Sequence, residues 1–172
     1  MFIWIILIFM LVIGILVNPV RAGIKFVEDL PLLNSIEEVN KKEEGLWALI
    51  EIGLPEINLP NIVKAKTLNS TNVYPNLELW YKIDNNHQYE DVYNRYAHIF
   101  ITLVSNEEGT KFELLAPDVI RIFLSYEDLQ KLGVNYLVRG AKLPDMEETD
   151  EIKLDEIYRD ESYVIYKVIY EF

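Results

Sequence analysis

The chain has 172 residues, of which 51% are hydrophobic, and a formal net charge of −12 at pH 7. Without the apolar N-terminal segment, its length of about 150 residues suits one domain with its own core. The acidic balance argues against nucleic acid as a partner, because no basic surface would release phosphate counterions. The absence of cysteine excludes disulfides, thiolate zinc sites and cysteine nucleophiles.

The first 20 residues form an apolar segment that stands apart from the rest. Residues 2–17 read FIWIILIFMLVIGILV. Counted through Val20 the run has about 19 residues, enough to cross a hydrocarbon core of about 30 Å. We therefore expect a transmembrane helix over residues 1–20, in contact with membrane lipid through residues 2–20, and one domain over residues 21–172.

Three interpretations of this segment differ in the fate of the helix. A cleaved signal peptide would place Val20 and Ala22 at the −3 and −1 positions, but no basic residue precedes the apolar run. A lone signal anchor conflicts with Arg21 and Lys25, which by the positive-inside rule would keep the domain in the cytoplasm. We favour the third interpretation, in which the helix is the last span of a longer multi-pass protein. It predicts a cell-membrane protein, crossing once within this chain, with the domain on the extracytoplasmic side.

The next segments alternate between helix and strand. Residues 33–44 have the pattern of an amphipathic helix, with Asn34 or Ser35 as its N-cap and Gly45 as its stop. Residues 46–52, LWALIEI, follow as a short apolar strand. A helix that leads through one glycine into a buried strand is typical of a fold that mixes helices with a sheet.

The middle of the chain is predicted to be less regular. We expect a loop over residues 53–71, with a short strand near 62–66. Two short helices should follow, the first beginning at Pro75 and the second covering residues 89–94. Residues 96–104 alternate apolar and polar side chains, which predicts a strand with two different faces.

The clearest local unit lies in the second half of the chain. The strands 96–104 and 111–115 flank an Asn-Glu-Glu-Gly turn and are predicted to pair as a hairpin. The strand 119–124, a helix capped by Ser125, and the strand 134–138 then form a βαβ crossover. Such a unit should be right-handed, with its two strands parallel.

The chain ends with an acidic loop and a hairpin. We expect residues 140–151 to be an exposed loop and the strands 152–158 and 163–170 to pair around a four-residue turn. The predicted fold class is therefore α/β: an α+β mixed sheet with a βαβ unit and a terminal β-hairpin, preceded by one transmembrane helix. The acidic loop lacks the oxygen spacing of a calcium loop, and the two histidines lack zinc-site spacing, so we expect no metal and no cofactor.

Polar and aromatic side chains concentrate in residues 72–98. Arg95 offers a planar fork for a phosphate or carboxylate, and His98 can donate or accept a proton near neutral pH. Aromatic faces suit the apolar face of a sugar ring. In the alternative, which we favour, Arg95 pairs with an acid such as Glu90 or Asp91 and the aromatic residues pack on the sheet. The ligand-binding candidates are Asn72, Tyr74, Trp80, Asn94, Arg95, Tyr96 and His98.

Four stretches of the chain resemble a known group of proteins. They are NVYPNLELW at 72–80, YNRYAHI at 93–99, DLQKLGVNYLVRG at 128–140 and IYRDESYVIYKV at 157–168. They resemble the C-terminal extracytoplasmic domain of large multi-pass bacterial membrane proteins, which in turn look like GT-C-type glycosyltransferases and related cell-envelope proteins. The resemblance implies a small α/β domain that follows the final span and ends in a hairpin.

The resemblance also carries an expectation about function. GT-C enzymes keep their catalytic acid in early membrane-proximal loops, and no nucleophile elbow, phosphate loop or dinucleotide pattern is found in this sequence. We therefore predict no catalytic residue and expect an accessory domain, not an enzyme as an isolated chain, that helps to position a glycan or lipid-linked sugar. Two alternatives stay open: a structural domain that docks on a multi-pass partner, and a domain that contributes catalytic groups to lipid-linked sugar transfer.

Overall fold

The computed structural model describes residues 2–17, 27, 29–144, 146, 149 and 152–171. The chain divides into two compact units, Met1–Leu30 and Pro31–Phe172. The first unit contains helix α1 (Phe2–Val17), which carries no charged residue. Across the described residues, no helix combines the length and apolar character needed to cross a membrane. The last three residues of the predicted span, 18–20, lie outside the described residues.

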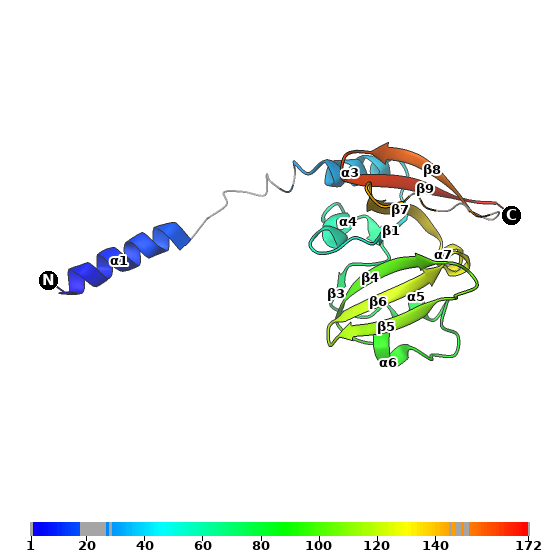
Figure 1. Ribbon diagram of the computed structural model, residues 1–172, viewed down its shortest axis with the longest axis horizontal. Helices are drawn as coiled ribbons and strands as arrows, with labels where there is room; N and C mark the ends of the chain where they lie inside the picture. The colour runs from blue at the N-terminus through cyan, green and yellow to red at the C-terminus, as the bar shows by residue number, and fades with distance from the viewer. Residues whose placement is uncertain are drawn as a thin grey trace. The chain divides into compact units, whose positions relative to one another are not determined.

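The second unit is built on a mixed β-sheet (Figure 1). Along its main path the strand order is β5-β6-β4-β1-β7-β9-β8. The four central strands run parallel, whereas β5 at one edge and β9 and β8 at the other are antiparallel to their neighbours. The predicted mixed sheet is thus confirmed. The strands are β1 (Leu46–Ile50), β4 (Ala97–Val104), β5 (Lys111–Ala116), β6 (Val119–Ser125), β7 (Val134–Gly140), β8 (Ile152–Arg159) and β9 (Tyr163–Tyr170).

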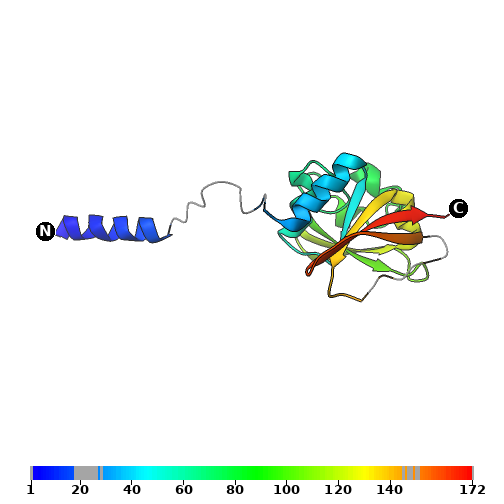
Figure 2. The same cartoon turned by 90° about the horizontal axis from the view of Figure 1, so that it is seen from above.

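Helix α3 (Pro31–Lys42) lies across one face of this sheet, as Figure 2 shows. It buries the apolar stripe that the sequence predicts, and the indole nitrogen of Trp47 in β1 donates to Asn40 Oδ1 of the helix at 3.3 Å. The helix begins at Pro31, before the predicted start. The predicted N-cap role of Asn34 or Ser35 is therefore wrong, because both residues lie inside the helix, where the Ser35 hydroxyl donates to the Pro31 carbonyl.

Gly45 has a second role beyond ending the helical segment. A Cβ atom at this position would lie 2.7 Å from Asn135 Cβ and 2.7 Å from Tyr136 Cε2 of β7. Only glycine therefore lets the chain enter β1 so close to its parallel neighbour.

The opposite face of the sheet is covered by several short helices. Trp80, Tyr93 and Leu129 from these helices form one apolar cluster with the inward residues of β4, Ile99 and Ile101. The covering helices are α5 (Leu77–Trp80), α6 (Glu90–Tyr93) and α7 (Tyr126–Leu132); the 3-10 helix η1 (Glu56–Asn58) and α4 (Leu59–Ile62) lie earlier in the chain. Helix α5 begins at Leu77 with Asn76 as its N-cap, so the predicted start at Pro75 is wrong by two residues.

The predicted hairpin between residues 96–104 and 111–115 does not form. Strand β5 instead pairs antiparallel with β6, and β4 pairs parallel with β6. The burial of each strand explains the arrangement. Most residues of β5 are exposed, which suits an edge strand, whereas β4 is buried or half-buried along its whole length and needs a neighbour on both sides.

The predicted βαβ unit is confirmed in its elements and its strand direction. Ser125 Oγ accepts a hydrogen bond from the Asp128 amide at 3.3 Å, and Gly133 ends α7 with a left-handed φ of 72°. Strands β6 and β7 are parallel, but β4 and β1 lie between them. The crossover therefore spans two strands rather than joining neighbours.

A short segment separates the first halves of β1 and β4. Its strand β2 (Lys66–Thr67) pairs with the start of β1, and β3 (Thr71–Asn72) pairs with the start of β4. Between them the fully buried Asn69 side chain accepts from the Leu49 amide at 2.9 Å and donates to the Leu49 carbonyl at 2.8 Å. The Asn69 carboxamide thus makes the two hydrogen bonds to Leu49 that a neighbouring strand would otherwise make. Strands β1 and β4 pair farther along, where Ile50 lies opposite Ile101.

Replacing Asn69 by alanine should lower the free energy of unfolding by about 2–4 kcal/mol, because two buried backbone groups of Leu49 lose their partner. Urea unfolding of the two proteins measures the difference. Asn61→Ala, at an exposed position in α4, is the matched control and should change stability by less than about 0.5 kcal/mol. Equal effects of the two substitutions would contradict the role of Asn69.

The turn of the terminal hairpin is organised by Asp160. Its Oδ1 accepts from the amides of Ser162 and Tyr163, both at 2.7 Å, and its Oδ2 accepts from the Tyr158 hydroxyl at 2.6 Å. Partial burial acts to raise the pKa of this carboxyl. The hydrogen bonds from Tyr158 and the two amides outweigh it and hold the pKa of Asp160 below its ordinary value.

A folded-state pKa below the unfolded one means that Asp160 stabilises the protein above the unfolded pKa of about 3.9, and that this stability is lost as the pH falls through the folded value. Asp160→Asn should therefore be less stable than the natural chain at neutral pH, and the gap should shrink below about pH 4. Urea unfolding across this pH range tests it. Glu161→Gln, the exposed neighbour, should show little gap at any pH. A constant gap for Asp160→Asn would refute the assignment.

Candidate functional site

Three of the predicted ligand-binding residues come together at the amino end of β4. His98 Nδ1 lies 2.8 Å from Thr71 Oγ1 of β3, and its ring packs edge-on against Tyr96 with centroids 5.7 Å apart. Asn72 lies opposite Ala97, and its Oδ1 accepts from the Ser70 hydroxyl at 2.7 Å. Asn72, Tyr96 and His98 thus share one corner of the sheet, although Asn72 and His98 already have protein partners there.

Arg95 has a different role from the one the sequence suggested. Its Nε donates to the Val92 carbonyl at 2.8 Å, its Nη1 to the Pro117 carbonyl at 3.4 Å, and its Nη2 to the Asp91 carbonyl. The expected pairing with a carboxylate of Glu90 or Asp91 is not among these contacts. The guanidinium instead joins the end of α6 to the turn between β5 and β6.

The remaining predicted residues do not converge on this corner. Trp80 is 1% exposed and packs edge-to-face against Phe112 at 5.6 Å, so its indole faces belong to the core. Asn94 lies exposed at the end of α6, and Tyr74 is 84% exposed in the loop after β3. Stacking of a sugar on Trp80 would require the core to open, whereas Tyr74 and Tyr96 are accessible as they stand.

Asp84 holds the helical layer of this stretch together. This buried carboxylate accepts from the Gln88 amide at 2.9 Å, from the Tyr89 amide at 2.8 Å and from the Tyr93 hydroxyl at 3.0 Å. Burial, and then the bond to Asp84, raise the pKa of Tyr93 well above its ordinary value, so the phenol stays protonated as a donor. Much of the polarity of residues 72–98 therefore serves packing.

A hollow of about 370 Å³ opens at the other end of the parallel strands. We call it the carboxyl-edge pocket. Its polar lining comes from Glu51, Ser105, Glu108, Tyr126 and Arg139, and its apolar lining from the ends of β1 and β4 and from the segment after β7. The chain order reverses at β1, with β4 and β6 on one side and β7 on the other. In open α/β sheets this switch point, outside the carboxyl ends of the strands, is where ligands bind.

Arg139 is the unusual residue of this pocket. It is 6% exposed and lies on the apolar face of β7, with Ile50 and Val164 as its neighbours across the sheet. Within the described parts of the chain, no hydrogen bond or ion pair reaches its guanidinium. Since a buried charge is costly without a partner, this position calls for an acceptor from elsewhere.

Glu51 forms the corner between this pocket and a second hollow. Its backbone has a left-handed φ of 55°, and its amide donates to the Ile101 carbonyl at 3.0 Å. The second hollow, of about 240 Å³, is also lined by Phe100, Thr102 and Arg121. A left-handed conformation is unfavourable for a residue with a side chain, so the β1–β4 junction holds Glu51 in place at this edge.

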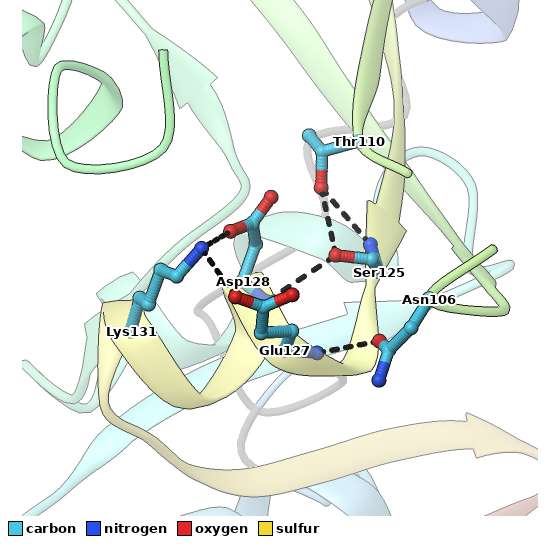
Figure 3. A network of polar contacts seen from close by, with 6 residues as sticks. All are labelled: Asn106, Thr110, Ser125, Glu127, Asp128 and Lys131. Atoms are coloured by element: carbon cyan, nitrogen blue, oxygen red, sulfur yellow. Dashed lines mark hydrogen bonds and ion pairs between the residues drawn. The ribbon is translucent and has the colours of Figure 1, made fainter. Parts of the chain in front are cut away.

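The rim of the carboxyl-edge pocket is fixed to α7 by the network in Figure 3. Asn106 Oδ1 accepts from the Glu127 amide at 2.8 Å, and Thr110 Oγ1 accepts from the Ser125 amide at 3.0 Å. Lys131 closes the network with ion pairs to Asp128 at 2.8 Å and to Glu127 at 2.9 Å. The loop that carries Ser105 and Glu108 and the helix that begins with Tyr126 are thereby held together.

Sequence reasoning did not single out Arg139 or Glu51. The available signal was an arginine inside the apolar run VNYLVRG, since charged residues are almost never fully buried without a partner. No group of histidine, cysteine, aspartate or glutamate in the described residues is arranged to hold a metal ion. All five acids of the loop 140–151 lie outside those residues.

Comparisons with known proteins identify a family but no activity. A family model described as "Domain of unknown function (DUF7654)" matches residues 27–171. No curated protein and no solved structure matches the chain.

Proposed function

The chain belongs to the DUF7654 family, and from this premise we propose that it is a membrane-anchored accessory domain of a bacterial cell-envelope protein. In this proposal α1 is part of a transmembrane helix and the folded unit lies on the extracytoplasmic side. The domain is not catalytic by itself. It helps a glycosyltransferase-like membrane protein to position a glycan or lipid-linked sugar.

The observation that carries the proposal is the composition of α1. All 16 of its residues are apolar or glycine, and its large side chains from Phe2 to Ile13 are exposed. A surface helix of a water-soluble protein has one apolar stripe, whereas a helix that is apolar all round needs an apolar environment on every side. The 16 residues of α1 reach about 24 Å along the helix axis. A span of about 30 Å therefore needs the segment counted through Val20.

The glycan part of the proposal rests on the accessible corner of the sheet. Tyr96 is 45% exposed and packs against His98, and Tyr74 and Asn94 are exposed nearby in the sequence. Aromatic faces and amide groups are the side chains that sugar rings contact in proteins. Arg95 and Trp80 take no part in this corner, because backbone carbonyls engage the guanidinium and the core encloses the indole.

Membrane anchoring by α1 can be tested with charge in the helix. The natural chain should stay with membranes after an alkaline carbonate wash. Leu7→Lys combined with Leu11→Lys should move it to the soluble fraction, because each lysine costs about 2.5–3.5 kcal/mol near the centre of a span. The matched control is Leu7→Ile with Leu11→Ile, which keeps the helix apolar and should stay in the membrane. Extraction of the natural chain by carbonate would contradict the proposal.

The side of the membrane is a separate prediction. Alkaline phosphatase fused after Phe172 should be active, because the enzyme folds only outside the cytoplasm, and a fluorescent protein that folds only in the cytoplasm should stay dark at the same position. The reverse pattern would show a cytoplasmic domain and would overturn the extracytoplasmic placement. Arg21 and Lys25 favour a cytoplasmic domain when the helix inserts alone. The fusions should therefore be made in the natural gene, so that any upstream membrane spans are present.

A further inference from the structure

The buried Arg139 of β7 indicates a binding site that is separate from the proposed function and independent of the membrane anchor. Its side chain is almost wholly buried on the apolar face of β7, beside Ile50 and Val164, and the part that stays open faces the carboxyl-edge pocket. Removing a charge from water is unfavourable unless hydrogen bonds and an opposite charge compensate. In the described parts of the chain neither is present at Arg139, and the residue lines the carboxyl-edge pocket. A bound anion would supply both.

The rest of the lining restricts the kind of anion. A guanidinium offers two parallel N–H donors, which match a carboxylate or a phosphate. Glu51 and Glu108 line the same pocket and would repel a doubly charged phosphate more than a singly charged carboxylate. As carboxylates they are acceptors only, so they favour ligand groups that donate hydrogen bonds. The Ser105 hydroxyl, 3.4 Å from Glu108 Oε1, belongs to the same rim.

We propose that the carboxyl-edge pocket binds a small carboxylate that also carries hydroxyl or ammonium donors. The carboxylate pairs with Arg139, and the donors face Glu51 and Glu108. The volume of about 370 Å³ lies at the small end of the range of about 300–1,000 Å³ for ligand pockets. The aliphatic side chains of Ile50 and Leu103 line the space for the carbon skeleton. Sugar acids and amino acids share this chemistry, and the test distinguishes them.

The experiment uses the full chain in mild detergent and isothermal titration calorimetry with four probes. Glucuronate carries a carboxylate with hydroxyl groups, and alanine carries one with an ammonium group. Glucose has the hydroxyl groups without the anion, and inorganic phosphate is an anion of higher charge. Saturable binding of glucuronate or of alanine, with no binding of glucose or phosphate, is the expected result. Which of the two binds identifies the source of the donors.

Variants locate the site. Arg139→Met keeps the length of the side chain without its charge and should weaken binding by about tenfold or more. The same change should leave the free protein at least as stable, because it removes a buried charge that no described group pairs. Arg121→Met, in the neighbouring hollow, is the matched control and should bind normally. Glu51→Gln, at an exposed side chain, should weaken binding without affecting the fold.

Several results would overturn the inference. These are the absence of binding by both carboxylates, equal binding of glucose or phosphate, and unchanged affinity in Arg139→Met. A marked loss of stability of the unliganded Arg139→Met protein would show that the arginine serves the fold instead. None of these results bears on the carbonate wash or the fusions, so failure of the pocket and failure of the membrane proposal are distinguishable.

Discussion

The two hydrogen bonds between the Asn69 side chain and Leu49 decide how the centre of the sheet is assembled. Parallel strands normally satisfy their backbone groups by pairing along their length. Here β1 and β4 are held apart at their amino ends, and a buried carboxamide serves the backbone of Leu49 in place of a strand. An unpaired buried backbone group is costly. Moving the segment between β2 and β3 out of the sheet would therefore leave the amide and the carbonyl of Leu49 without partners. The strands then meet only where the inserted segment ends, at Ile50 and Ile101.

This meeting point separates the two ends of the sheet in their chemistry. At the amino end, the inserted segment brings Thr71 against His98 and fills the space between the strands. At the carboxyl end, β1 and β4 diverge from the junction into separate loops, and Glu51 turns away in a left-handed conformation. The pocket opens there, with the buried Arg139 of β7 in its wall. The packed end and the hollow end thus lie on opposite sides of the Ile50–Ile101 junction.

Signals that are local in the sequence predicted much of the fold. The cap at Ser125, the left-handed Gly133 and the terminal hairpin all depend on residues within a few positions of one another. Strand pairing was harder to predict from the sequence. Strand β5 pairs with β6 and not with β4 because β5 is mostly exposed and β4 is buried or half-buried along its whole length. The candidate site was hardest. Residues 94–98 were grouped because they are neighbours in sequence, whereas the carboxyl-edge pocket joins residues near 51, 105 and 139, which only the sheet topology brings together.

Hydrogen exchange at the Leu49 amide is the most direct test of this account. If the Asn69 carboxamide acts as a strand partner, this amide should exchange as slowly as those at the centre of β4 and β7, through global unfolding only. In Asn69→Ala the same amide should exchange much faster, by local opening. The amides at the centre of β7 should still exchange only through global unfolding of the variant. Rapid exchange at Leu49 in the natural chain would contradict the account, because the strands would then be joined by other contacts.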